Sequence, residues 1–436
     1  MTRSPPPYAS QPYASSPRDA GRRSGDAGAP VRLAVLAPHP VHYSCALLRR
    51  IAREPDIELT AFFGSDITVR PHHDSGFAAR IEWDVPLLDG FRHELLPAWG
   101  RSRETSFWWP FVHGVGRRLA EGRFDWLLVH GYNRPAHWLA MAQARRRGIG
   151  VMIRDEANAI SRPRGLFKRA VKPLYFALLD RAADRFLSVG TLNAAYYREL
   201  GISDAKIVPV PWAVDNAFFQ AGDEDVRDGD VRDGAKPAEL RRQLGIPTDS
   251  PVILYASRLQ RRKLPDLVLD AFRSLSPAAA ARDPHLVFVG EGEMAAPLRA
   301  AAAGLGGVHF AGFQGQRAMR RFYDLCDVFV LPSVHEPWGL VVNEAMNLGR
   351  PVVVSDQVGS GYDLVRDGEN GFVVPAGDVG ALAAALSAIL ADPERARRMG
   401  RRSREIIDGW DCEADVRGLR RALGLPPAAP AGGALA

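Results

Sequence analysis

Cysteine is scarce in this chain of 436 residues, where Cys45, Cys326 and Cys412 lie far apart and form no Cys-x-x-Cys pair. This excludes a disulfide scaffold and a cysteine metal site, and it fits a reducing compartment. No stretch approaches the ~20 apolar residues that cross a bilayer, and the first residues lack the apolar core of a signal peptide. We therefore expect a cytoplasmic protein, and any membrane contact to be peripheral, on the inner face of the plasma membrane.

The chain also lacks a large excess of charge of one sign. Its 56 Lys and Arg residues and 50 Asp and Glu residues give a net charge of +6. Such a balance favours phosphates or an anionic surface without requiring nucleic acid, so we expect no nucleic-acid partner. The hydrophobic content of 46% is sufficient for a large core divided among two or three domains.

Short apolar runs alternate with amphipathic stretches in two successive series. The first series of predicted strands is 31–37, 57–63, 126–129, 149–153, 186–189 and 207–210, and the second is 252–255, 286–289, 308–311, 328–331, 352–354 and 372–374. This alternation predicts an α/β fold with two parallel sheets, each covered by helices. In such sheets ligands bind at the carboxyl ends of the strands, so we expect the site in the cleft between the two domains.

Changes in composition set the expected boundaries along the chain. The start of the chain repeats Pro-Tyr-Ala-Ser and cannot bury enough surface to order itself, and residues 220–237 are acidic and rich in glycine. The expected parts are a disordered tail (1–30), a first Rossmann-like α/β domain (31–219), an acidic linker with a lead-in helix (220–250), a second Rossmann-like α/β domain (251–409) and a C-terminal helix and tail (410–436).

The most informative loop contains Glu336 and follows a predicted strand. A helix that begins near Gly339 then carries Glu344, and the free N–H groups of Gly339, Leu340 and Val341 form an anion site beside both acids. Carboxylates accept hydrogen bonds from sugar hydroxyls, and N–H groups suit phosphate. The pattern therefore favours a nucleoside diphosphate sugar; the alternative is that the two glutamates are ordinary solvated acids.

This region closely resembles the signature of retaining glycosyltransferases of family 4, the group 1 glycosyltransferases. The matching stretches are 336–346 (EPWGLVVNEAM), 349–356 (GRPVVVSD), 367–372 (DGENGF), 256–259 (ASRL) with Lys263, 289–292 (VGEG) and 327–333 (DVFVLPS). The resemblance implies the GT-B architecture, in which two Rossmann-like, doubly wound domains face a central cleft. It also implies transfer of a hexose from a nucleotide diphosphate sugar to a hydroxyl of a glycan or lipid-linked acceptor, with retention of configuration.

The resemblance assigns roles to residues of the second domain. It makes Glu344 the acceptor of hydrogen bonds from the ribose, Glu336 a contact to the donor sugar, and Arg258 and Lys263 the clamp on the diphosphate. Two cations at the end of one strand can neutralise the charge on a leaving diphosphate. No carboxylate is placed as a nucleophile, so the leaving diphosphate would assist attack on the same face of the sugar.

Gly290 and Gly292 formally fit a dinucleotide fingerprint, G-x-G-x-x-A. They lie inside the second domain, however, and no acid follows the next strand to bind a ribose. We expect a close backbone approach to the nucleotide there, the alternative being a tight turn without a ligand. The base is expected near Phe313, where main-chain atoms would recognise it.

Candidates on the acceptor side lie at strand ends of the first domain. His39, His42 and Tyr43 follow the first strand, where many family members have a Gly-rich loop that is absent here. They are expected to contact acceptor or phosphate, with a capping or turn role as the alternative. His130 matches the place of an active-site histidine in the family and could titrate or hydrogen-bond near neutral pH.

Arg154, with Asp155 and Glu156, also ends a strand, and one of these residues is expected to bind acceptor unless they form an ion pair within the domain. Asp-x-Asp patterns at 223–225 and 228–230 resemble a metal motif but lie in the linker, so we expect no metal and no other required cofactor. The basic and apolar stretch 162–176 suggests either peripheral membrane contact or a helix that covers its own sheet. The aromatic group 107–111 would either stack on an acceptor sugar or belong to the core.

Two other functions remain open. A GT-B phosphorylase or epimerase would show phosphate-dependent or acceptor-free turnover. A non-catalytic nucleotide-sugar-binding partner in polysaccharide assembly would bind nucleotide without turnover.

Overall fold

The computed structural model describes residues 29–74, 79–99, 107, 111–158, 160, 166–221 and 237–427. Most of the expected tail, most of the acidic linker with its Asp-x-Asp patterns, and parts of the 107–111 and 162–176 stretches lie outside these residues. Among the described residues, no helix combines the length and the apolar character needed to cross a bilayer.

The first domain is built on a seven-stranded parallel sheet with the order β11-β10-β9-β8-β1-β2-β5. The strand order grows in both directions from β1, so the fold is doubly wound. Two antiparallel pairs, β3 with β4 and β6 with β7, were not expected from the sequence. The strands are β1 (Val31–Ala37), β2 (Ile57–Phe63), β3 (His72–Asp74), β4 (Ala79–Ile81), β5 (His93–Leu95), β6 (Ala98–Trp99), β7 (Phe111–Val112), β8 (Trp126–His130), β9 (Gly150–Asp155), β10 (Arg185–Ser188) and β11 (Ile207–Pro209).

The second domain contains a six-stranded parallel sheet with the order β14-β13-β12-β15-β16-β17. Every residue of its four inner strands is buried, which explains their continuous apolar sequences. The strands are β12 (Val252–Ala256), β13 (His285–Val289), β14 (Val308–Phe310), β15 (Val328–Leu331), β16 (Val352–Ser355) and β17 (Gly371–Val374). The α/β prediction with two doubly wound parallel sheets is confirmed.

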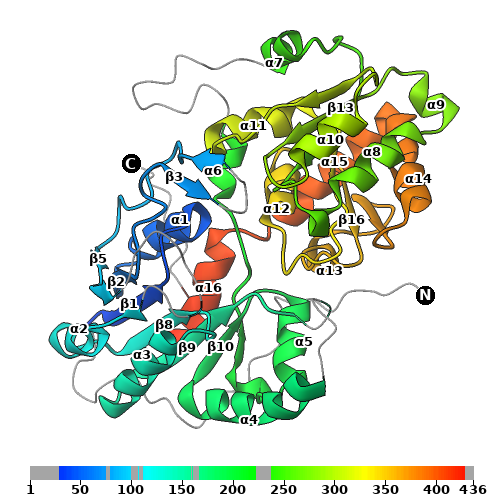
Figure 1. Cartoon of the computed structure of the whole chain (residues 1–436). Helices are drawn as coiled ribbons and strands as arrows, with labels where there is room; N and C mark the ends of the chain where they lie inside the picture. Colours follow the sequence, from blue (N-terminus) through cyan, green and yellow to red (C-terminus); the bar gives the residue numbers. More distant parts are fainter. Residues whose placement is uncertain are drawn as a thin grey trace.

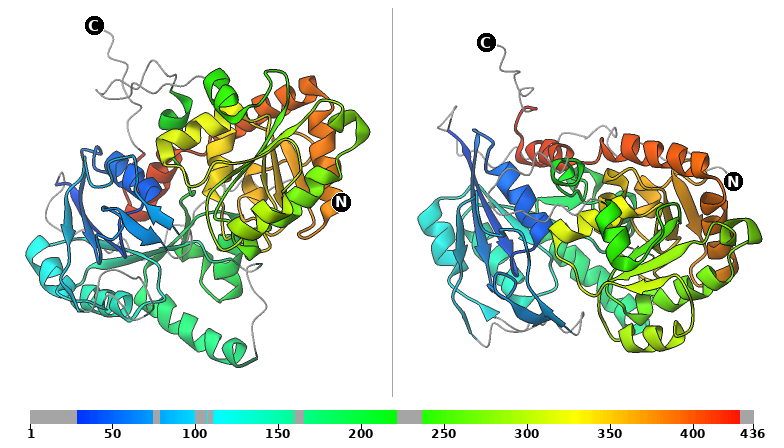
Figure 2. Two further views of the ribbon diagram at one scale, coloured as in Figure 1. Left: turned by 45° about the horizontal axis from the view of Figure 1, so that its top comes forward. Right: turned by 90° about the horizontal axis from the view of Figure 1, so that it is seen from above.

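Helices cover both sheets, and the two domains lie side by side (Figures 1 and 2). The first domain has α1 (His42–Ile51), α2 (Val115–Gly122), α3 (Pro135–Arg146), α4 (Leu166–Ala182) and α5 (Thr191–Glu199). The remaining helices are α6 (Asn216–Gln220), α7 (Pro237–Leu244), α8 (Pro265–Arg273), α9 (Pro277–Ala280), α10 (Ala295–Ala301), α11 (Gln316–Leu325), α12 (Leu340–Asn347), α13 (Gly361–Leu364), α14 (Val379–Leu390), α15 (Pro393–Ile407) and α16 (Cys412–Leu423).

The last helix, α16, returns to the first domain and packs there (Figure 1). Val416 and Leu419 of α16 are buried in the same apolar cluster as β1 and α1. A Cβ atom on Gly418 would come within 2.4 Å of the Pro209 carbonyl oxygen, so glycine permits the close approach of α16 to β11. The end of the chain therefore completes the core of the domain in which the chain begins.

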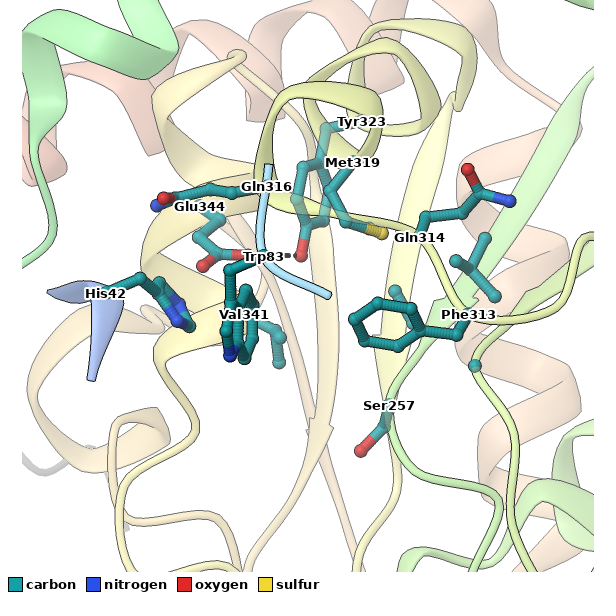
Figure 3. A pocket seen from close by; sticks show the side chains of 13 residues that line it. His42, Trp83, Ser257, Phe313, Gln314, Gln316, Met319, Tyr323, Val341 and Glu344 are labelled. Atoms are coloured by element: carbon teal, nitrogen blue, oxygen red, sulfur yellow. Dashed lines mark hydrogen bonds between the residues drawn. The ribbon is translucent and has the colours of Figure 1, made fainter. Parts of the chain in front are cut away.

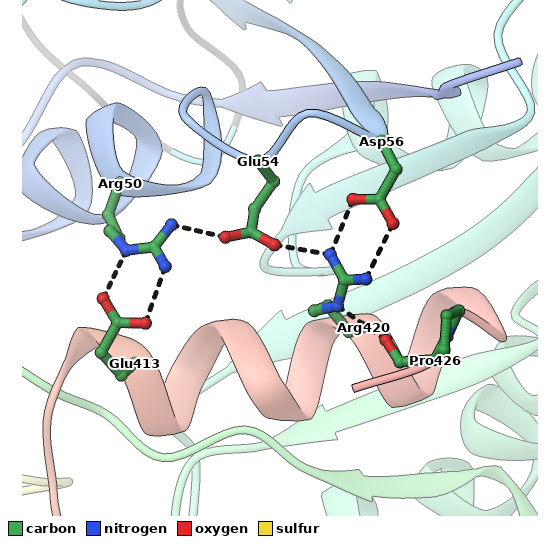
Figure 4. A network of polar contacts seen from close by, with 6 residues as sticks. All are labelled: Arg50, Glu54, Asp56, Glu413, Arg420 and Pro426. Atoms are coloured by element: carbon green, nitrogen blue, oxygen red, sulfur yellow. Dashed lines mark hydrogen bonds and ion pairs between the residues drawn. The ribbon is translucent and has the colours of Figure 1, made fainter. Parts of the chain in front are cut away.

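Ion pairs fix α16 to the first domain (Figure 4). Arg420 donates to Glu54 at 2.5 Å and to both carboxylate oxygens of Asp56 at 2.7 Å. Arg50 bridges Glu54 at 2.6 Å and Glu413 at 2.7 Å. The side chains of Arg420 and Glu54 are only 5% and 6% exposed, so these charges depend on one another.

Each domain also caps a helix of the other. Asp363 of the second domain accepts hydrogen bonds from the Thr191 backbone N–H at 2.9 Å and hydroxyl at 2.5 Å, at the start of α5. Asp84 of the first domain accepts from the N–H groups of Gln316 at 2.7 Å and Arg317 at 3.0 Å, at the start of α11. Burial raises the pKa of Asp363 to about 6, and the bonds from Thr191 oppose this shift. The caps hold the two domains together on either side of the cleft.

Replacing Arg420 should destabilise the chain strongly. Arg420→Ala removes the cation from Asp56 and leaves the buried Glu54 with Arg50 as its partner, so the free energy of unfolding should fall by about 3 kcal/mol. Chemical denaturation measures the change. The control is Arg402→Ala, which removes an exposed pair with Glu369 and should cost at most about 0.5 kcal/mol. Equal effects of the two substitutions would contradict the anchoring role of Arg420.

Candidate active site

The site begins where β15 ends and α12 starts. Gly339, the residue before α12, has φ of +93°, and a Cβ atom there would lie 3.1 Å from side-chain atoms of Glu336 and Leu331. Glycine therefore suits this turn, because it adopts a positive φ readily and has no Cβ atom to crowd these side chains. Leu340 and Val341 form the first turn of α12, which has no side-chain cap. The helix starts as expected from the sequence, and its first N–H groups have no partner within the helix.

Glu336 and Lys263 form an ion pair with each other in this structure. Their side chains are 12% and 8% exposed, so the pair is largely buried. Lys263 lies in the short 3₁₀ helix Arg261–Lys263 after β12, and burial lowers the pKa of its ammonium group. The positive charge of Arg262 lowers it further, whereas the carboxylate of Glu156 opposes the shift.

Glu156 brings a first-domain carboxylate to the same place. It follows β9, and its charge acts on Lys263 and Arg262 of the second domain. Enclosure by protein raises the pKa of the Glu156 carboxyl, although the side chain remains accessible to solvent. Cations of the second domain thus face an acid of the first domain across the cleft.

Arg258 is held from the first domain as well. Its Nη2 atom lies 3.1 Å from Oδ2 of Asp74, which ends β3. The Arg258 side chain is 40% exposed, and its charge acts on Lys263. The structure therefore brings the two expected diphosphate ligands together and pairs each with a carboxylate.

Gly290 and Gly292 allow a close approach between two backbone segments. Their φ values are +129° and +154°, and Cβ atoms on them would lie 2.1 Å from the Ser257 carbonyl oxygen and 2.5 Å from that of Leu259. The two glycines therefore shape the loop that carries Arg258. Gly290 also lines the cavity described next.

A cavity of about 170 Å³ lies between the domains, with Glu344 in its wall (Figure 3). Tyr323 of α11 donates a 2.6 Å hydrogen bond to Oε2 of Glu344. Burial raises the pKa of Glu344 to about 7, and the bond from Tyr323 opposes this shift. The lining residues are His42, Trp83, Ala256, Ser257, Val289, Gly290, Phe313, Gln314, Gln316, Met319, Tyr323, Val341 and Glu344. Its wall combines apolar side chains with a few polar groups, as is typical of a small-molecule site.

The histidines expected on the acceptor side are neutral in this structure. Burial lowers the pKa of His39 and of His42 to about 4. Burial, with the nearby Arg154 charge, lowers the pKa of His130 to about 3. Of the two expectations for His130, burial disfavours titration near neutral pH, and a neutral imidazole can still donate or accept a hydrogen bond.

Two further acceptor-side candidates pack within the protein. His42 is the first residue of α1, and its ring centre lies 4.3 Å from that of Trp83. The Tyr43 ring meets Trp212 edge-on at 5.5 Å, and burial raises the pKa of its phenol. Tyr43 is also close enough to Arg258 for that charge to act on it.

Arg154 is turned toward α16. Its guanidinium donates to Asp415 at 2.5 Å and to the Pro211 carbonyl oxygen at 3.1 Å, and it lies 4.3 Å from the Trp212 ring centre. Both members of the ion pair are 2% exposed. The alternative role expected for Arg154 was an ion pair within the first domain. Arg154 does form an ion pair, but its partner Asp415 lies on the C-terminal helix α16.

Several site residues were not expected from the sequence. They are Trp83, Asp74, Asn158, whose side chain donates to the Pro337 carbonyl oxygen at 2.8 Å, and Tyr323, whose hydroxyl donates to Glu344. The segment with Asp74 and Trp83 has no helical or strand period that could have marked it. Among the described residues, no group of three or more His, Cys, Asp or Glu side chains is arranged to hold a metal ion.

Comparison of sequences connects the chain with known proteins. Residues 237–406 match the family described as glycosyl transferases group 1. The chain is 28% identical over 445 residues to a D-inositol 3-phosphate glycosyltransferase of Streptomyces griseus, which covers 91% of this chain and 89% of that relative. It is 31% identical over 261 residues to the protein of that name in Thermomonospora curvata, covering 56% of this chain and 58% of the relative. A lipopolysaccharide core biosynthesis glycosyltransferase, LpsE of Rhizobium meliloti, is 37% identical over 174 residues, covering 39% and 48%.

Solved structures share the fold across both domains. Anabaena Alr3699/HepE in complex with UDP superposes with a TM-score of 0.67 at 16% identity and covers 91% of this chain and 99% of that one. Sucrose-phosphate synthase from Thermosynechococcus elongatus gives a TM-score of 0.65 at 21% identity, covering 90% and 98%. The chain therefore has the GT-B architecture, with two doubly wound domains facing a cleft, and its residues 237–406 carry the sequence of the group 1 glycosyltransferases.

Proposed function

We propose that this protein transfers a hexose from a nucleoside diphosphate sugar to a hydroxyl of a glycan or lipid-linked acceptor, with retention of configuration as in family 4. The observation that carries the proposal is the convergence of Glu344, Arg258, Lys263 and the start of α12 on one interdomain cleft. This set supplies acceptors for ribose hydroxyls and donors for a diphosphate.

In the proposed reaction the bond between the anomeric carbon and the diphosphate oxygen breaks. The acceptor oxygen forms the new bond on the same face, and its proton passes to the leaving diphosphate. Arg258, Lys263 and the first N–H groups of α12 stabilise the charge that develops on the diphosphate. Glu336 contacts the donor sugar, and neutral His130 is placed on the first-domain side to hydrogen-bond to sugar or acceptor.

The relatives suggest which substrates to test first. UDP is bound in the Anabaena structure, and the names of two other relatives refer to D-inositol 3-phosphate and to lipopolysaccharide core biosynthesis. We therefore expect UDP-hexoses to be the first donors worth testing, with phosphorylated polyols and glycans as acceptors. No metal or other cofactor is proposed, so turnover should persist when a chelator is present.

The proposed location is the cytoplasm, with peripheral contact to the inner face of the plasma membrane. The outer face of α4 supports this contact, because Leu174 and Leu178 are 66% and 47% exposed there while Phe176 and Leu179 are buried in the core. Side chains four residues apart lie on the same face of a helix. The helix thus covers its own sheet and also presents apolar side chains outward.

Glu344→Ala should weaken binding of UDP by about 10- to 100-fold, because a hydrogen bond to a charged group contributes about 1.5–3 kcal/mol. Calorimetric titration measures the change. Glu369→Ala, at an exposed glutamate in the same domain, serves as the control and should leave affinity unchanged. Unchanged affinity in Glu344→Ala would remove Glu344 from the ribose site.

Binding of UDP should also depend on pH through Glu344. Its carboxyl has a pKa raised to about 7, so lowering the pH from about 8 to about 6 protonates most of it and removes the stronger acceptor. Affinity should fall by up to about 10-fold over this range in the wild type. Glu344→Gln should keep only the part of the pH dependence that belongs to the diphosphate; an identical profile would contradict the assignment.

Lys263→Ala should lower kcat by about 10²-fold or more if Lys263 stabilises the leaving diphosphate. The matched control is Arg261→Ala, an exposed cation in the same 3₁₀ helix, which should keep near-normal turnover. Release of UDP from a UDP-hexose measures both variants, and thermal unfolding checks that each is folded. Near-normal turnover of Lys263→Ala would remove it from the mechanism.

The UDP-release assay also distinguishes the proposed transferase from the two alternative functions. Turnover that requires inorganic phosphate, or that proceeds without acceptor, would indicate a phosphorylase or an epimerase. Binding of UDP without turnover of any donor would indicate a non-catalytic partner.

A further inference from the structure

A segment of the first domain forms part of the cavity that faces Glu344. Trp83, in the loop after β4, lines this cavity together with residues of the second domain (Figure 3). Its ring meets Phe313 edge-on, with 5.9 Å between ring centres and an interplanar angle of 80°. On its other side His42 lies 4.3 Å away. Trp83 therefore stands between a first-domain ring and a second-domain ring at the mouth of the cavity.

The next residue fixes the position of Trp83. Asp84 caps α11 through the N–H groups of Gln316 and Arg317. Gly315 makes this contact possible, because a Cβ atom there would come within 2.3 to 2.7 Å of the Asp84 carboxylate. Since α11 also carries Tyr323, the helix that holds Trp83 in place is the helix that positions Glu344.

Much of the cavity wall is apolar. Phe313, Met319 and Val289 line the cavity, and His42 is neutral because burial lowers its pKa to about 4. The polar side chains in the wall are those of Glu344, Gln314, Gln316, Tyr323 and Ser257, the last of which precedes the clamp residue Arg258. A flat aromatic ring fits an apolar wall of this kind, whereas a diphosphate does not.

We propose that Trp83 packs against the base of the donor nucleotide and that Asp84 holds Trp83 in position, so that the first domain takes part in retaining the nucleoside. This proposal rests on the proposed function, because it places a base in the cavity next to Glu344. It adds a nucleoside contact from the opposite domain. Opening of the cleft would break the cap on α11 and withdraw Trp83 from the base in one movement.

The test compares probes with and without a nucleoside. Wild-type protein is titrated with UDP, GDP, ADP and pyrophosphate, and the variants are then titrated with the nucleotide that binds and with pyrophosphate. Trp83→Ala should weaken the nucleotide by about 10-fold, a typical contribution of stacking on a base, and leave pyrophosphate unchanged. Trp83→Phe should recover most of the affinity because it restores an aromatic face. Trp99→Ala is the control, since Trp99 is 63% exposed on β6 of the same domain.

Asp84→Ala tests whether Asp84 holds Trp83 in position. It should weaken the nucleotide several-fold, and combined with Trp83→Ala it should add little, because both changes remove the same contact. If Trp83→Ala does not fold, Trp83→Leu keeps apolar volume without a ring and should show the same selective loss. Equal weakening of nucleotide and pyrophosphate, or no weakening of the nucleotide, would overturn the proposal. Failure of wild-type protein to bind any of the three nucleotides would instead contradict the proposed function itself.

Discussion

The cleft depends on helix starts in each domain whose backbone N–H groups are satisfied by the other domain. The first N–H groups of a helix have no partner within it. Here Asp84 of the first domain supplies the acceptor for α11, and Asp363 of the second supplies it for α5. Each domain supplies a carboxylate to a helix of the other domain. Separation of the domains would therefore remove hydrogen bonds from both helix starts. The cavity next to Glu344 is lined by residues of both domains, and these caps connect the two domains.

The two cations proposed to bind the diphosphate are each paired with a carboxylate. Arg258 is paired with Asp74 across the cleft, and Lys263 is paired with Glu336 within the second domain. Lys263 is 8% exposed, and a charge so deeply buried is costly without an anionic partner. In the proposed reaction the diphosphate replaces Asp74 as the partner of Arg258, and it gives Lys263 a second anion. This exchange would connect nucleotide binding to the contacts that hold the domains together.

Much of the fold could be predicted because the signals are local. The inner strands of the second domain are buried on both faces, so their sequences are continuous apolar runs. A glycine, Gly339, precedes α12, where the backbone adopts a positive φ. Partners that are distant in the sequence could not be predicted. Arg154 ends a strand that points to the cleft, but its partner Asp415 lies 261 residues away on a helix expected only to end the chain. Trp83 and Asp84 belong to a loop without any repeating pattern, and their importance comes from α11 of the other domain.

A crystal structure of the protein with UDP would test the central claim most directly. The account predicts the diphosphate at the start of α12 within hydrogen-bond distance of Arg258 and Lys263, the ribose hydroxyls on Glu344, and the base against Trp83, with Asp74 no longer bonded to Arg258. UDP bound away from the cleft, or in the cleft without contact to Glu344 and Arg258, would contradict it.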